Sequence, residues 1–310
     1  MNKPKLSFWR IWNLSFGFLG VQIGYSLQNS NTSSIFESLG ADVSHLSYFW
    51  LAAPLAGMIV QPIVGLFSDG TWTRWGRRIP YILGGSLIST LALVLMPNCP
   101  KLLAFAPLAM GAFILLFMDL SFNVTMQPFR ALVADMLDDS QKTQGYVVQT
   151  FLINLGAVVG AILPLVMTWL GVSDEAAPEH VSPHIVYSYY AGGAILLLTV
   201  LVTSFKTREY PPGEFARYNN LSDEGGAKPV SFAGLMRPGV MVRLGVTQFF
   251  SWAALFLMWT YLKPAITGVV TDHATGEVLS AGATQTWVGV LNGTYPIPAC
   301  IAALFLARVA

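Results

Sequence analysis

Long apolar stretches run along almost the whole of this 310-residue chain, in which 54% of the residues are hydrophobic and 11% are charged. A helix needs about 20 mostly apolar residues to cross the hydrocarbon core of a bilayer. Soluble domains carry about 25% charged residues, so a soluble fold of this chain would expose a large, aggregation-prone apolar surface. The sequence therefore predicts an all-α membrane protein.

About eight stretches have the length and composition of membrane-crossing helices. Several of them contain glycine and proline, which membrane helices tolerate because neighbouring helices pack closely against them. We expect spans at residues 8–30, 46–68, 80–97, 103–128, 144–170, 185–205, 239–262 and 284–307.

Lysine and arginine are distributed unequally between the two sides that eight crossings create. Fifteen fall on one side, and the other side holds two, Lys101 and Lys263. Cytoplasmic loops carry the excess of these residues in membrane proteins. We therefore expect the amino terminus to lie in the cytoplasm.

A polar segment rich in proline and glycine, residues 206–236, separates the first six expected spans from the last two. Such a segment is typical of a linker between two folded units. Six helices, a polar link and further helices is the plan of proteins built from two six-helix halves. We expect a six-helix bundle at 1–205, a cytoplasmic linker at 206–236 and the first two helices of a second bundle at 237–310. About four of twelve expected helices are then outside this sequence.

The loop between the second and third expected spans, GLFSDGTWTRWGRRIP at residues 65–80, combines an aspartate with three arginines. Asp69 can accept hydrogen bonds from helix-terminal amides, and the arginines can pair with the partner half in one conformation and release it in another. This pattern favours a cytoplasmic gate over charges that only set the orientation, which would need neither the acid nor the glycines. The expected gate residues are Asp69, Arg74, Arg77, Arg78, Arg130 and Asp135.

Four segments together resemble one known group of proteins: GVQIGYSLQNSN at 20–31, FWLAAPLAGMIVQPIVGLFSD at 49–69, WGRRIPYILGG at 75–85 and MDLSFNVTMQPFRALVADML at 118–137. They are similar to plant sucrose/proton symporters and to bacterial disaccharide permeases of the glycoside-pentoside-hexuronide group of the major facilitator superfamily. The loop at 65–80 also resembles the major facilitator signature, although Gly70 stands where a basic residue commonly follows the aspartate. The resemblance implies a twelve-helix major facilitator fold, of which about eight helices are present, and a sucrose- or maltose-like substrate.

Asp119 is the one carboxylate near the middle of an expected span. A charged group at the bilayer centre costs roughly 2.5–3.5 kcal/mol on insertion scales, so we expect it to face an interior cavity. Apolar surroundings favour a neutral acid, and contact with water restores the charge, so such a group can load and release a proton. In the family that the sequence resembles, the aspartate of this D-L-S-x-N segment couples transport to protons, and the resemblance assigns that role to Asp119. The alternative is an aspartate that only hydrogen-bonds a neighbouring helix.

Amide and aromatic side chains on inward helix faces are the expected ligands of a sugar. Amides can bind paired hydroxyl groups, and rings can lie against the C–H face of a sugar. For each such residue the alternative is hydrogen bonding between helices or anchoring at the membrane interface. The expected substrate-binding residues are Tyr25, Gln28, Asn29, Asn123, Gln149 and Trp252, and further candidates include Gln61, Asn292 and Tyr295.

The function that these features predict is import of a disaccharide together with a proton by alternating access. Sodium coupling and a non-transporting sugar sensor remain alternatives. An enzyme is disfavoured because the spans contain no nucleophile and base pair, metal-ligand cluster or phosphate-binding loop. We expect no metal or cofactor, a monomer in the lipid bilayer of a bacterial plasma membrane, and no nucleic-acid partner, since a net charge of +1 supplies no basic face.

Overall fold

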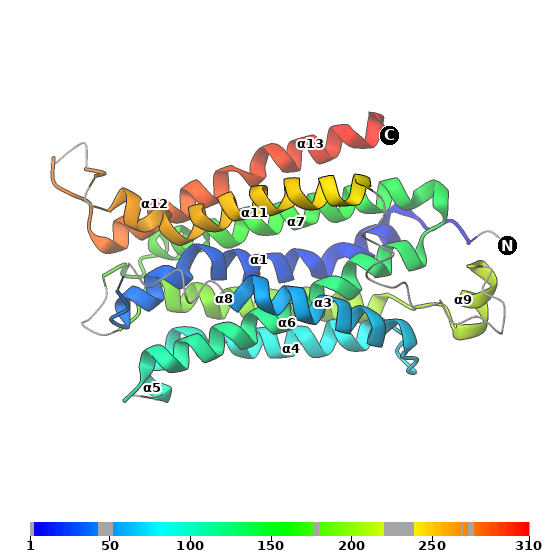
Figure 1. Cartoon of the computed structure of the whole chain (residues 1–310), viewed down its shortest axis with the longest axis horizontal. Coiled ribbons are helices and arrows are strands. Elements are labelled where there is room, and N and C mark those ends of the chain that lie inside the picture. Colours follow the sequence, from blue (N-terminus) through cyan, green and yellow to red (C-terminus); the bar gives the residue numbers. More distant parts are fainter. Residues whose placement is uncertain are drawn as a thin grey trace.

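The computed structural model describes residues 3–42, 52–103, 105–175, 180–219, 239–267, 269–271 and 276–309. In these residues it is a bundle of long helices that run alongside one another (Figure 1). Five helical stretches within the described ranges are long and apolar enough to cross a membrane. The prediction of an all-α membrane fold is confirmed.

Six long helices form the first part of the bundle, and each lies at one of the first six expected spans. Residues 46–51 of the second expected span are outside the described ranges. After the third long helix, the turn η2 (Met96–Asn98) and the short helix α5 (Cys99–Leu102) continue the chain. The long helices are α1 (Phe8–Ser38), α3 (Ala52–Gly70), α4 (Ile79–Leu95), α6 (Pro107–Met136), α7 (Asp139–Trp169) and α8 (Pro183–Lys206).

Helix α1 continues beyond its expected end at residue 30 as far as Ser38. Its last turns are polar, but they hydrogen-bond within the helix. The side chains of Asn31 and Thr32 donate to the carbonyls of Leu27 and Gln28, one turn earlier, at 2.9 and 2.6 Å. These polar residues therefore extend the helix, whereas hydropathy alone predicts an earlier end.

The second part of the bundle contains α11 (Gly239–Ile266), α12 (Ala281–Thr294) and α13 (Pro296–Val309). The eighth expected span, 284–307, is thus two helices that meet at Tyr295. Pro296 has no backbone N–H to donate to the preceding turn, which explains the break. In the expected linker, α9 (Pro212–Tyr218) is a short helix, and residues 220–236 are outside the described ranges.

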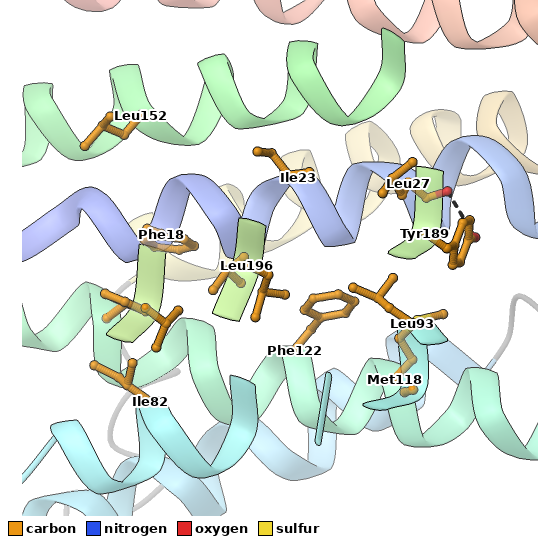
Figure 2. Close-up of a cluster of buried hydrophobic side chains, with 14 of the residues drawn as sticks. Phe18, Ile23, Leu27, Ile82, Leu93, Met118, Phe122, Leu152, Tyr189 and Leu196 are labelled. Carbon is orange, nitrogen blue, oxygen red and sulfur yellow. Dashed lines mark hydrogen bonds between the residues drawn. The ribbon is translucent and has the colours of Figure 1, made fainter. Parts of the chain in front are cut away.

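The core of the bundle lies between α1, α4, α6 and α8 (Figure 2). Phe122 of α6 and Leu196 of α8 are fully buried there, and the Tyr189 hydroxyl donates to the Leu27 carbonyl at 3.2 Å. On the other side of α1, α7 approaches very closely: a Cβ atom placed on Gly160 would lie 2.4 Å from the Ile23 carbonyl oxygen. Glycine thus permits the backbones of α1 and α7 to touch.

The two ends of the bundle differ in charge. We call the end that contains Arg77 and Arg78 the basic end; it also carries the N-terminus and α9, at the right of Figure 1. Lys101, in α5, and Lys263, near the end of α11, lie at the opposite end.

Candidate functional site

Asp119 lies near the middle of α6 and is 1% exposed, so it faces protein. Its neighbours Met118 and Phe122 point into the core between α1 and α4 (Figure 2). Gln28 of α1, which is fully buried, donates from Nε2 to Asp119 Oδ1 at 2.5 Å. The two side chains form a buried polar pair that joins α1 to α6.

A cavity of about 170 Å³ lies between α1 and α7 of the first part and α11 and α12 of the second. Tyr25, in its wall, interacts electrostatically with Asp119. Its wall combines amide and hydroxyl groups with aromatic rings, and Asn292 Oδ1 is buried without a hydrogen-bond partner among the described residues. Such a wall can bind hydroxyl groups and the apolar face of one ligand together. Lining residues include Tyr25, Asn29, Ser30, Trp252, Trp259 and Asn292.

Three of the six predicted substrate-binding residues, Tyr25, Asn29 and Trp252, line this cavity. Asn123 of α6, another predicted ligand, bonds to protein groups. Its side chain accepts from Gln61 Nε2 of α3 at 2.7 Å and donates to the Asp119 carbonyl at 2.8 Å. Asn123 therefore ties α3 to α6 and does not line the cavity.

The other two predicted ligands also point elsewhere. Gln28 is bonded to Asp119 and is not part of the cavity wall. Gln149 is buried and donates from Nε2 to the Phe129 carbonyl at 3.1 Å, which holds α7 against α6. For Gln149 the structure thus favours the alternative, an amide that bonds between helices.

Four of the six predicted gate residues meet at the basic end. Arg78 contacts Asp69 of α3 through Nη2 at 2.5 Å and Asp135 of α6 through Nε at 2.9 Å. Arg77 contacts the same Asp135 oxygen through Nη2 at 2.5 Å. The cluster joins α3, α4 and α6 within the first six helices, whereas the sequence led us to expect pairs with the second half.

Arg74 and Arg130 do not join this cluster. Arg74 lies over the Trp75 ring, 5.6 Å from its centroid. Arg130 is exposed, and it lies on a different face of α6 from Asp135 because five residues separate them. In the described part of the chain neither arginine forms an ion pair with Asp69 or Asp135. A gate role for these two arginines stays a prediction.

Glu209, which the sequence reasoning missed, completes the basic end. Its carboxylate accepts from the backbone amides of Arg77, Arg78 and Ile79 at 3.0, 2.8 and 2.8 Å, at the N-terminus of α4. A carboxylate is favoured there because the first amides of a helix have no partner within it. Burial raises the pKa of Glu209, and these amide hydrogen bonds oppose the shift. The sequence feature that could have revealed it is an acidic residue directly after the sixth expected span.

At the opposite end, polar residues of α1 bind the helices of the second part. Lys263 of α11 donates to Glu37 and to the Ser34 hydroxyl, and Gln285 of α12 donates to the Ser30 carbonyl at 2.7 Å. Glu37 and Gln285 were also missed. The run of polar residues at the end of α1 indicated that polar side chains from other helices pack against it.

The described residues contain no group of three or more His, Cys, Asp or Glu side chains that could hold a metal ion. Cys99 and Cys300 are free thiols on different helices. The expectation of a protein without metal or cofactor stays a prediction.

Comparison with known proteins gives a match to the sequence model of a family described as "MFS/sugar transport protein", over residues 35–291. The general alpha-glucoside permease of Schizosaccharomyces pombe is 26% identical over 283 residues, which are 84% of this chain and 48% of the permease. A sucrose transport protein of Arabidopsis thaliana is 31% identical over 157 residues, 46% of this chain and 26% of that protein. A rice sucrose transport protein is 24% identical over 331 residues, 96% of this chain and 60% of its own length. The chain thus spans about half the length, or less, of most of these relatives.

A solved structure has the same fold. It is the crystal structure of a bacterial homologue of the human lysosomal transporter Spinster, in an inward-facing and unoccupied conformation. The superposition has a TM-score of 0.57 with 14% sequence identity, and it covers 92% of this chain and 59% of the other.

Proposed function

Because the chain belongs to the MFS/sugar transport protein family, we propose that it is a secondary transporter that carries a sugar across a membrane. One observation carries the proposal: amides and aromatic rings line a cavity where the two parts of the bundle meet, and Tyr25 in its wall interacts with a buried acid, Asp119. Transporters of this architecture bind their substrate between the two halves.

The proposed substrate is a disaccharide of the sucrose or α-glucoside type. The named relatives are sucrose and alpha-glucoside transport proteins, which supports this class. Tyr25, Trp252 and Trp259 offer ring faces to a sugar, and Asn29 and Asn292 offer amides to its hydroxyl groups. The cavity, at about 170 Å³, is smaller than the roughly 300 Å³ at which pockets for drug-sized ligands begin. Admission of two sugar rings therefore requires the helices around it to move apart.

The proposed coupling ion is a proton, bound at Asp119. The acid is buried beside core residues such as Met118 and Phe122, where its neutral form is favoured, and the side chain that donates to it, Gln28, is an uncharged amide. Each proton that enters along a membrane potential contributes about 2.3 kcal/mol per 100 mV. A tenfold difference in sugar concentration corresponds to about 1.4 kcal/mol. One proton moved across 100 mV therefore supports an inside-to-outside sugar concentration ratio of roughly forty. Sodium is the alternative, which would use several oxygen ligands.

In the proposed orientation the basic end faces the cytoplasm, in agreement with the excess of lysine and arginine there. The polar contacts of α1 with α11 and α12 then lie on the outer side, which supports an inward-facing arrangement, and α7 also packs along α12 and α13. The Spinster homologue, whose fold this chain shares, was solved in that conformation. Residence in a bacterial plasma membrane stays a prediction; the relatives named above come from yeast and plants.

Transport in proteoliposomes tests the proposal. The intact protein is reconstituted in vesicles loaded with unlabelled sucrose or maltose, and labelled sugar is added outside. We expect counterflow of label, and accumulation above equilibrium when the outside is made acidic but not when only a sodium gradient is imposed. Binding without exchange would indicate a sensor, and accumulation driven by sodium alone would establish the sodium alternative. Conversion of the sugar would contradict transport.

A further inference from the structure

The pair of Gln28 and Asp119 has two oxygen atoms that no described residue hydrogen-bonds. Gln28 Oε1 and Asp119 Oδ2 are both buried, and neither has a hydrogen-bond partner among the described residues. A buried polar atom without a partner costs about 1–3 kcal/mol. Such atoms are rare in folded proteins, and each one calls for an explanation.

A single proton would satisfy both atoms. An ionised carboxylate only accepts hydrogen bonds, as does the carbonyl oxygen of an amide, so these two oxygens cannot bond while Asp119 is charged. A protonated carboxyl group gains one O–H donor. Carboxyl and amide groups are both planar, and each presents two polar atoms side by side. Two hydrogen bonds in parallel can therefore form between them.

From these observations we infer that Gln28 is a positioning residue that holds Asp119 in its protonated form. In this acid–amide pair Asp119 donates from Oδ2 to Gln28 Oε1, while Gln28 Nε2 donates to Asp119 Oδ1. The proton comes from water on the side to which the site opens and returns to water on the other side. The inference rests on the proposed role of Asp119 in coupling. It adds Gln28 as a residue that forms two hydrogen bonds with the protonated acid and one with the ionised acid.

The charges around Asp119 are compatible with a neutral acid. Among titratable residues, Tyr25 of α1 interacts electrostatically with Asp119. Other titratable groups on α6 and on the helices packed against it lie toward the helix ends, away from the middle of α6. They are Arg10 and Glu37 of α1, Asp69 of α3, Tyr81 of α4, Cys99 and Lys101 of α5, Arg130 and Asp135 of α6, and Asp139, Lys142 and Tyr146 of α7. Within the described ranges no cation pairs with Asp119 to hold it in its charged form; Arg130 interacts electrostatically with Tyr25 instead.

Infrared difference spectroscopy between acidic and alkaline buffer tests the pair in the intact, reconstituted protein. A protonated Asp119 gives a carboxylic acid C=O band, which Asp119→Asn must remove. Because Gln28 Nε2 donates to the oxygen that carries this C=O bond, Gln28→Leu should move the band to higher wavenumber. Gln28→Asn, which is shorter by one methylene, should move it in the same direction and remains informative if the leucine variant does not fold.

Gln149→Leu is the matched control, since Gln149 is also a buried amide but donates to a backbone carbonyl. It should leave the Asp119 band in place. A band that stays at the wild-type position in both Gln28 variants, or no band that depends on Asp119, would overturn the acid–amide pair. Counterflow of sugar is measured on the same vesicles. Intact counterflow with an unmoved band refutes the pair alone, whereas absent wild-type counterflow refutes the proposed function.

Discussion

Lys263 of α11 and Glu37 of α1 form a buried ion pair, with 2.5 Å between Nζ and Oε2 and side chains that are 9% and 23% exposed. The pair joins the two parts of the bundle at the end opposite the basic end. Toward the basic end, residues 242–254 of α11 are exposed. The ion pair therefore lies where the two parts meet, on the side proposed to be closed.

Replacement of Lys263 by methionine should favour separation of the two parts at this end. Removal of one partner of a buried ion pair costs about 3–5 kcal/mol, because the other charge is left unpaired. Spin labels at Lys101, which lines a pocket together with Glu37, and at Val269, which follows α11, are both at exposed positions. They would report the change as longer distances in double electron–electron resonance.

The double variant Glu37→Gln with Lys263→Met leaves no unpaired charge, so its distances should return toward those of the wild type. Identical distance distributions in the wild type, the single variant and the double variant would show that the ion pair does not hold the two parts together.

Gly160 should not tolerate a side chain. The Cβ atom of an alanine there would lie 2.4 Å from the Ile23 carbonyl oxygen and 2.9 Å from Ser26 Cβ, so α1 and α7 would have to move apart. Overpacking of this kind costs about 1–3 kcal/mol. Gly84→Ala on α4 is the control, since no atom lies within 4 Å of its Cβ position. We expect thermal unfolding in detergent to occur at lower temperature for Gly160→Ala only; equal loss in both variants would contradict the close approach of α1 and α7.

The sequence predicted the helices and the buried acid better than it predicted partners. Asp119 stood out because no other carboxylate interrupts the middle of an apolar span. Glu209 and Glu37 were missed because their partners are 132 and 226 residues away along the chain. For Gln149 the sequence could not decide between a sugar ligand and an amide that bonds between helices, because a helix that is apolar on most sides does not reveal which face it turns to a cavity. Hydropathy alone did not show the break at Tyr295, because Pro296 interrupts the helix without interrupting the apolar stretch.

Glu209 should make stability depend on pH. Its pKa in the folded protein is raised above the ordinary value of 4.5 by burial, so the folded state binds the proton more tightly than the unfolded state. The stabilisation is complete below the unfolded-state pKa and is lost as pH rises through the folded-state pKa. Compared with that of Glu209→Gln, the unfolding temperature of the wild type should therefore fall as pH rises from 4.5 through the raised folded-state pKa. Glu175→Gln, in an exposed loop, controls for net charge; a constant difference between wild type and Glu209→Gln would contradict the prediction.

Asn292 should contribute to sugar affinity. Its Oδ1 is an unpartnered acceptor in the described residues, in the wall of the cavity. Loss of one hydrogen bond costs about 1 kcal/mol, so Asn292→Ala should raise the KM for sugar about fivefold in counterflow. Asn154→Ala is the control because Asn154 is bonded to the Thr150 carbonyl of its own helix at 2.8 Å. An unchanged KM in Asn292→Ala would place the sugar elsewhere.

Proton movement that accompanies the sugar tests the proposed coupling at Asp119 most directly. Sucrose or maltose is added to weakly buffered vesicles that contain the intact protein, and the external pH is followed. The wild type should make the external solution more alkaline as sugar and proton enter together. Asp119→Asn should abolish this pH change yet retain counterflow of labelled sugar, because exchange needs no net proton transfer. An undiminished, sugar-dependent pH change in Asp119→Asn would contradict the account.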